Sequence, residues 1–103
     1  MDVCLLLDFY GQLLTIRTRH LLELHYEEDM SFSEIGEVEN ISRQAVHDGV
    51  KRGIKSLQKF EEKLGLVQRF LTQKEQIIEA AQALDEKNIQ KAKDIMQKLQ
   101  KQL

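Results

Sequence analysis

Six polar side chains in the middle of the chain have the chemistry needed to bind nucleic acid. Arginine and glutamine side chains suit the edges of guanine and adenine respectively. Lysine and further arginine side chains suit phosphates, which position a protein on nucleic acid without specifying a sequence. The candidate binding residues are Arg43, Gln44, His47, Lys51, Arg52 and Lys55. A partly cationic, solvated helix face explains the same residues equally well, and Asp48 adds a negative charge among them.

The element that must position these side chains is a pair of helices joined by a tight turn. The stretch Ser31–Leu57 has the pattern of a helix-turn-helix, with a short capped helix, a turn and a longer second helix. Gly36 is small where the helices cross, Asn40 tolerates the left-handed conformation of a tight turn, and Ser42 is an N-cap. Apolar side chains are expected where the helices meet: Ile35, Ile41 and Val46. The alternative is a helical hairpin with a polar turn.

Two positions in this stretch depart from the pattern. Glu39 and Gly49 stand where the pattern has apolar residues, and we expect the neighbouring Val38 and Val50 to substitute for them. Gly49 and Gly53 each cost the helix about 1 kcal/mol relative to alanine. Because these two glycines lie four residues apart, they form a smooth surface that could admit another helix closely.

The composition predicts one small all-α domain, or one such domain with a helical extension. The chain has 103 residues with no proline, and leucine, glutamate, lysine and glutamine dominate its second half. No apolar run reaches the roughly 18 residues that a membrane span needs. Acidic residues flank the short apolar stretch 3–7, unlike a signal peptide. The single cysteine, Cys4, is expected to be a buried apolar residue in a reducing cytoplasm.

The charge of the chain is distributed unevenly along its length. Residues 1–41 carry a net charge of −7, and residues 42–103 carry one of +5. A phosphate-binding surface therefore belongs to the second part, and the acidic part must point away from a nucleic acid. The net charge of the whole chain is only a weak indication of DNA binding, since many DNA-binding proteins are markedly basic.

Apolar spacings of three and four residues, together with caps and stops, predict six helices. Their expected ranges are 2–13, 16–28, 33–39, 42–64, 66–84 and 89 onwards. Thr15, Ser42 and Asn88 are the expected N-caps, and Gly65 is the expected stop of the fourth helix. The inward stripes of the first, second and fifth helices are expected to contain Leu5, Leu6, Phe9, Leu13, Ile16, Leu21, Leu24, Tyr26, Leu66, Phe70, Ile77, Ile78, Ala81 and Leu84.

The chain is expected to divide into a helix-turn-helix domain at residues 1–64, with its motif at about 31–57, and a C-terminal helical extension at 65–103. The stripe of the last helix is narrow and consists of Ile89, Ala92, Ile95 or Met96, and Leu99. Because so narrow a stripe on a charged helix cannot form an independent core, it must pack on its neighbour or on a partner chain. We therefore expect a homodimer through this extension.

No group of residues has the spacing of a catalytic or metal site. The three histidines, His20, His25 and His47, lack metal-ligand spacing, and His25 is expected to be a partly buried helix residue. The acidic run 27–29 lacks the glycine-punctuated loop of a calcium site, and there is no glycine-rich loop for phosphates. The serines are expected to be helix caps. We expect no enzyme, no cofactor and no metal.

Residues 13–57 resemble region 4 of bacterial sigma factors. Both have a capped helix, an acidic turn, a short helix containing E-I-G and a recognition helix that starts with Ser-Arg. A closer resemblance, over roughly residues 1–64, is to the YlxM-like family of small helix-turn-helix proteins. It rests on the run Ile41–Val46 and on the N-terminal pattern of Leu6, Phe9, Tyr10, Leu13, Leu14 and Thr15. The remainder of the chain looks divergent.

The resemblance implies that Arg43, Gln44 and His47 lie on the exposed first turns of a recognition helix. In the YlxM-like family the gene commonly neighbours genes of the signal recognition particle, which implies a regulatory role in that protein-targeting pathway. The implied partner is the RNA or the GTPase subunit of the particle. The alternatives are a sequence-specific DNA-binding transcription regulator and a helix-mediated interaction protein that does not bind nucleic acid. The acidic first part and Asp48 favour the last of these.

Overall fold

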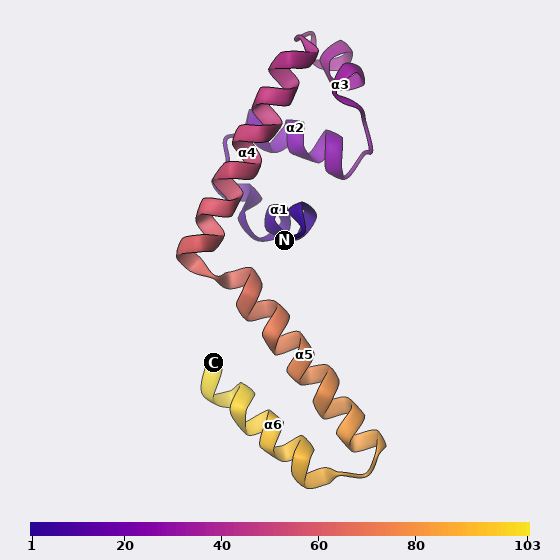
Figure 1. Ribbon diagram of the computed structural model, residues 1–103, viewed down its shortest axis with the longest axis vertical. Helices are drawn as coiled ribbons and strands as arrows, with labels where there is room; N and C mark the ends of the chain where they lie inside the picture. Colours follow the sequence, from indigo (N-terminus) through magenta and orange to yellow (C-terminus); the bar gives the residue numbers. More distant parts are fainter. The chain divides into compact units, whose positions relative to one another are not determined.

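The computed structural model describes residues 1–103, and all of its regular elements are helical, which confirms the predicted all-α fold. The chain divides into two compact units, residues 1–67 and residues 68–103. No helix combines the length and the apolar character needed to cross a membrane. The elements in chain order (Figure 1) are α1 (Val3–Tyr10), the 3₁₀ helix η1 (Gly11–Leu13), α2 (Ile16–Tyr26), α3 (Phe32–Glu39), α4 (Arg43–Leu64), α5 (Leu66–Asp85) and α6 (Ile89–Gln102).

Polar side chains set the starts of the helices in the first unit. The hydroxyls of Thr15 and Ser42 each accept a hydrogen bond from the backbone N–H three residues later, at 3.2 and 3.0 Å, as predicted. Ser31 and Glu34 form a reciprocal pair at the start of α3, in which each side chain accepts from the other's N–H at 3.1 Å. The predicted caps therefore fix where α2, α3 and α4 begin.

The turn between α3 and α4 depends on two residues with special backbone requirements. Asn40 adopts a φ of 56°, the left-handed conformation expected of it. A Cβ atom at Gly36 would lie 2.8 Å from the carbonyl oxygen of Ile41. The N–H of Ile41 also donates to the carbonyl of Gly36 at 3.0 Å. The two backbones are thus in direct contact at the predicted turn, and no side chain fits between them.

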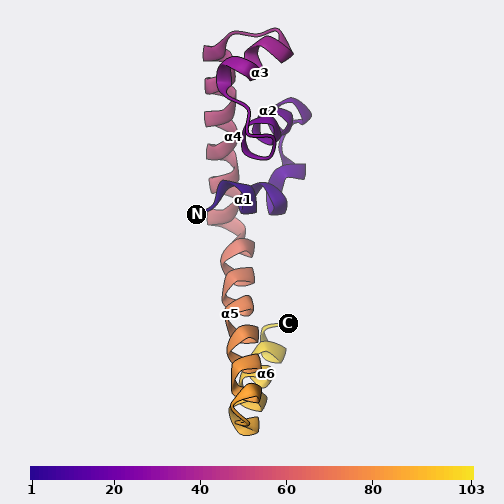
Figure 2. The same cartoon turned by 90° about the vertical axis from the view of Figure 1, so that its right-hand side faces the viewer.

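α4 packs closely on α2 because two glycines face that helix. A Cβ atom at Gly49 would lie 2.8 Å from Cδ1 of Leu21, and one at Gly53 would lie 2.7 Å from Cδ1 of Leu22. Figures 1 and 2 show α1, α2 and α3 on one side of α4. The smooth surface predicted on α4 therefore admits another helix, and that helix is α2 of the same chain. Val50 beside it is buried, as expected.

The expectation that Val38 substitutes for Glu39 as an apolar contact is wrong. Val38 is 67% exposed and does not replace Glu39 in the core. Glu39 follows the buried Ile35 by four residues, slightly more than one helical turn, so the two side chains lie on the same side of α3. Val38 is rotated from Glu39 by about 100°. Glu39 is half-buried there and pairs with His20 of α2. A polar contact between α2 and α3 stands where the pattern expects an apolar one.

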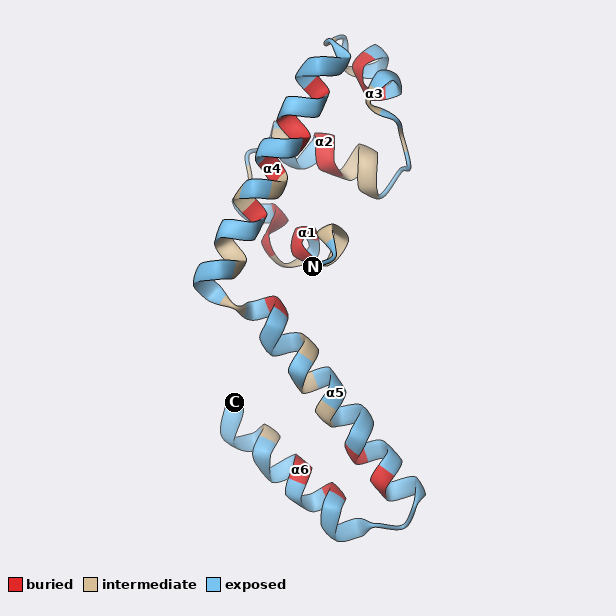
Figure 3. Ribbon diagram, in the orientation of Figure 1, coloured by how far each residue is buried: buried red, intermediate tan, exposed pale blue.

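The core of the first unit draws on all four of its helices. Ile16 is 89% exposed rather than buried, because it stands on the first turn of α2, ahead of the segment that meets α4. Leu13 is also exposed, because the chain tightens into η1 after α1 and the residue leaves the face of that helix. Figure 3 marks the buried residues in red. The most buried side chains of this unit are Leu6, Leu7, Tyr10, Leu21, Leu22, Ile35, Val46, Val50, Leu57 and Val67.

A hydrogen-bond network joins α1 and α4 to the first residues of α5. The buried Tyr10 hydroxyl donates to Oε1 of Glu61 at 2.5 Å and accepts from the N–H of Leu66 at 3.1 Å. The same carboxylate oxygen accepts from the N–H of Val67 at 3.0 Å. Burial, followed by the bond to Glu61, raises the pKa of Tyr10 and keeps it a donor. Gly65 between the helices has a φ of 62°, as expected of a helix stop.

The second unit is a hairpin in which α6 returns along α5. Its buried residues are Ala80 and Ala83 of α5 and Ala92 and Ile95 of α6. The Arg69 guanidinium donates to the carbonyl of Gln102, which joins the start of α5 to the end of α6. Asn88 caps α6 as predicted, since its side chain accepts from the N–H of Lys91 at 3.1 Å.

The predicted inward stripe of α5 is wrong within this unit. Ala80 and Ala83 are buried, whereas the larger apolar residues of the expected stripe are about half exposed. On α6 the choice between Ile95 and Met96 is decided, since Ile95 is buried and Met96 is exposed. The exposed apolar side chains of the two helices include Ile77, Ile78, Leu84, Ile89 and Met96.

We predict that Gly36→Ala destabilises the first unit, although alanine favours helices. Removing the glycine adds about 1 kcal/mol of helix propensity, but the new methyl meets the Ile41 carbonyl, and overpacking costs about 1–3 kcal/mol. Urea denaturation of the full chain should therefore show a lower free energy of unfolding. Glu37→Ala, at an exposed site on α3, is the control and should change stability by less than about 0.5 kcal/mol. A more stable Gly36→Ala protein would contradict the close backbone contact.

Candidate nucleic-acid interface

α4 carries all six of the residues predicted to bind nucleic acid, and all six are exposed. The opposite side of the helix is fixed in the core by Val46, Gly49, Val50, Gly53 and Leu57 (Figure 3). Because the core holds one face of α4, the same contacts hold the other face toward solvent. The Ser42 cap begins the helix, so Arg43 and Gln44 lie on its first turn.

Asp48 contacts Gln44 and His47, two of the three side chains expected on the first turns of the recognition helix. Nε2 of Gln44 donates to Oδ1 of Asp48 at 3.0 Å, and Nδ1 of His47 lies 3.4 Å from the same oxygen. The bond from His47, followed by that from Gln44, lowers the pKa of Asp48. The carboxylate is therefore ionised at neutral pH. Base reading by Gln44 or His47 requires these contacts to open beside a negative charge.

The three residues predicted to bind phosphates divide between two sides of α4. Lys51 and Lys55 lie one turn apart, in the i, i+4 relation that places side chains on one face. Arg52 is rotated from Lys51 by about 100°. Its side chain lines a separate pocket of about 250 Å³, together with Arg17 and Asp48 among others. The structure therefore brings Lys51 and Lys55 together and places Arg52 with Arg17.

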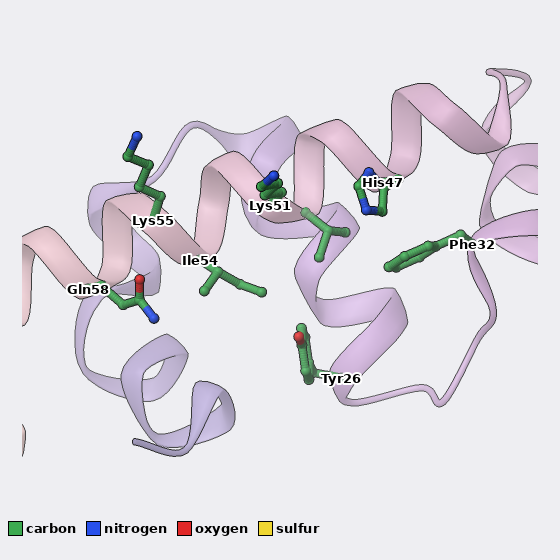
Figure 4. A pocket seen from close by; sticks show the side chains of 8 residues that line it. Tyr26, Phe32, His47, Lys51, Ile54, Lys55 and Gln58 are labelled. Atoms are coloured by element: carbon green, nitrogen blue, oxygen red, sulfur yellow. The ribbon is translucent and has the colours of Figure 1, made fainter.

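The surface of the first unit has a groove next to Lys51 and Lys55. It has a volume of about 480 Å³ and lies between the end of α2, the start of α3 and the middle of α4. In Figure 4, Ile54 and Gln58 extend from α4 toward the side that Tyr26 and Phe32 occupy, while Lys55 points away from it. We call this surface the aromatic groove; its lining residues are Tyr26, Phe32, His47, Val50, Lys51, Ile54, Lys55 and Gln58.

His25 holds the aromatic side of the groove in place. Its Nδ1 lies 2.8 Å from the carbonyl oxygen of Met30, and the half-buried ring bridges the loop between α2 and α3. The imidazole centroid lies 4.8 Å from that of Tyr26 and 4.6 Å from that of Phe32. The Phe32 ring in turn lies 5.7 Å from that of His47. His25 is thus the partly buried helix residue that was predicted, and its role is to order neighbouring rings.

The sequence pattern did not identify this groove. Tyr26 was expected only as an inward-facing residue, and Phe32, Ile54 and Gln58 were not predicted to bind a ligand. The groove combines residues from three helices, which lie together only after α2 and α3 have packed on α4. No local spacing marks such a site.

Comparisons with known proteins identify the family. Residues 1–102 match the family described as "Putative helix-turn-helix protein, YlxM / p13 like". The chain belongs to this family. It is 42% identical over 102 residues to a UPF0122 protein of Desulforamulus reducens, covering 92% of this chain and 87% of the relative. It is 54% identical over 78 residues to one of Acetivibrio thermocellus, covering 76% and 67%, and 36% identical over 96 residues to one of Clostridium botulinum, covering 93% and 88%.

Membership in the YlxM-like family confirms the resemblance predicted from the sequence and extends it. The predicted resemblance ended near residue 64, whereas the family match continues through α5 and α6 to residue 102. The C-terminal part therefore belongs to the family match, although the relative from Acetivibrio thermocellus aligns over only 78 residues. The family is described as one of helix-turn-helix proteins, which indicates a regulatory or nucleic-acid-binding role.

We predict that Asp48→Asn strengthens the binding of nucleic acid several-fold at low salt. The substitution removes a negative charge from the exposed face of α4 and frees Gln44 and His47 from a carboxylate. Fluorescence anisotropy with a labelled duplex measures the change in affinity. Asp8→Asn, which removes an exposed carboxylate from α1, is the matched control. If both substitutions strengthen binding equally, only net charge matters and Asp48 has no local effect on the interface.

Proposed function

We propose that this protein is a non-enzymatic cytoplasmic regulator that binds nucleic acid through the exposed face of α4. The observation that carries the proposal is the arrangement of this one helix. Its buried face is fixed by α1, α2 and α3, and its other face presents all six predicted binding residues to solvent. A rigid helix that carries exposed basic side chains, with Lys51 and Lys55 one turn apart on one face, is suited to nucleic acid, because little ordering is needed when it binds.

RNA of the signal recognition particle is the partner we favour. The family association with that particle supports the pathway, and the geometry of Asp48 weighs against DNA reading. A DNA reader needs its first-turn side chains for base edges in the major groove, yet Gln44 and His47 both contact Asp48. Lys51 and Lys55 remain suited to phosphates, which RNA and DNA share. The GTPase subunit of the particle is the alternative partner if no RNA binds.

The net charge of −7 on residues 1–41 is compatible with this proposal. Five of the nine acids in this segment belong to α1, α2 and α3, which lie on one side of α4, and three more, Glu27, Glu28 and Asp29, lie in the loop after α2. Repulsion from these acids directs a phosphate backbone toward the opposite, solvent-facing side of the helix. The same repulsion predicts modest affinity.

The test is a parallel anisotropy titration with signal recognition particle RNA and with mixed-sequence duplex DNA, at low and physiological salt. We predict RNA binding that persists at physiological salt and weaker DNA binding that is lost. Lys51→Ala and Lys55→Ala should each weaken binding and reduce the slope of log affinity against log salt by about 1. Lys93→Ala on α6 is the control for loss of one positive charge. Binding to neither nucleic acid would contradict the proposal and leave a protein-interaction module.

We also propose that the chain forms a homodimer through α5 and α6. The exposed apolar side chains of these helices support it: Ile77, Ile78, Leu84, Ile89 and Met96. Together they form the kind of surface that a second copy can cover.

Sedimentation velocity of the full chain at tens of micromolar should therefore show a dimer. Ile77→Lys should shift the population toward monomer, because a charge at an apolar contact is costly to bury. Arg17→Lys, at an exposed site in the first unit, should leave the population unchanged. A monomer for the unsubstituted chain at this concentration would contradict the dimer.

A further inference from the structure

The aromatic groove has the chemistry of a site for an unpaired nucleobase. Its volume of about 480 Å³ falls within the range of roughly 300–1,000 Å³ typical of small-ligand pockets. Tyr26 and Phe32 supply aromatic faces, and Val50 and Ile54 supply apolar contacts. Gln58 adds an amide that can both donate and accept hydrogen bonds. Flat aromatic ligands with polar edges match such a combination.

The charges around the groove select an anionic ligand. The charged side chains of its lining are Lys51 and Lys55, and no carboxylate is among the lining residues. An aromatic ring that carries a phosphate next to it is complementary to both the rings and the lysines. Proteins that bind single-stranded nucleic acid use this combination, in which bases stack on aromatic side chains and a basic surface follows the backbone.

We propose that the aromatic groove binds one unpaired base of a nucleic acid whose backbone runs along Lys51 and Lys55. This inference rests on the proposed function and specifies its ligand as a single strand, a loop or a bulge. In a duplex, bases remain stacked and paired, so they cannot enter the groove without being extruded. The base stacks against Phe32, whose ring is ordered by its contacts with the rings of His25 and His47.

The position of Phe32 permits a direct test by fluorescence. The chain contains no tryptophan, so Phe32→Trp introduces a single reporter into the groove. The probe is an oligoadenylate RNA of about 12 nucleotides, a length within the roughly 4–16 nucleotides of known single-strand sites. We expect the RNA to quench this tryptophan, and oligoadenylate paired with oligouridylate to quench it much less. Ile16→Trp, at an exposed site on α2 outside the groove, is the matched reporter and should not respond.

Affinity measurements on a second variant separate stacking from electrostatics. Phe32→Leu keeps an apolar side chain but removes the ring, and it should weaken binding of the single strand by roughly 5- to 100-fold. Binding of the paired RNA should change by less than about twofold. Lys51→Ala should weaken both. Thermal unfolding of each variant, followed by circular dichroism, establishes that the fold is retained.

Three results would overturn the assignment of the groove. Equal losses for single-stranded and paired RNA in Phe32→Leu would make Phe32 a structural residue only. If Lys51→Ala weakens binding while Phe32→Leu has no effect, the proposed function stands and the groove plays no part in it. If the emission of Phe32→Trp changes with protein concentration in the absence of RNA, a second copy of the chain fills the groove. Failure of the unsubstituted chain to bind any RNA would contradict the proposed function itself.

Discussion

The close contact of α2 with Gly49 and Gly53 is the constraint on which the first unit depends. Side chains of α2 occupy the space where Cβ atoms of α4 would otherwise stand. Each glycine costs the helix about 1 kcal/mol of propensity. In exchange, Leu21 and Leu22 can pack directly against the backbone of α4. This contact settles which face of α4 is buried. The exposed face, the aromatic groove and the pocket beside Arg52 all follow from that choice.

The arrangement explains how a chain with an acidic first part can present a basic helix. α1, α2 and α3, which carry five of the nine acids of residues 1–41, lie on one side of α4, and Lys51 and Lys55 are exposed to solvent. Asp48 places a negative charge near the start of the helix, where it contacts the side chains of Gln44 and His47. The strongest remaining surface is therefore the one that combines the two lysines with Tyr26 and Phe32. Such a surface suits the backbone and loops of an RNA better than the base edges of a duplex.

Local sequence patterns predicted most of the fold and only part of the site. Caps, the left-handed Asn40 and the stop at Gly65 follow from single residues and their neighbours, and they were predicted correctly. The contacts that went wrong depend on tertiary packing. Val38 is exposed because α3 turns Glu39 toward α2, and alanines rather than the larger residues of α5 face α6. The aromatic groove was missed for the same reason, since it is assembled from three helices that are distant in local spacing.

The most direct test of α4 as the binding surface is a nuclear magnetic resonance titration of the full chain with signal recognition particle RNA. Backbone amide shifts should move first for residues on the exposed face between Arg43 and Gln58. The amides of Tyr26 and Phe32 should move with them, while those of α6 stay unchanged. Shifts confined to residues 68–103, or an unchanged spectrum at saturating RNA, would contradict α4 as the nucleic-acid interface.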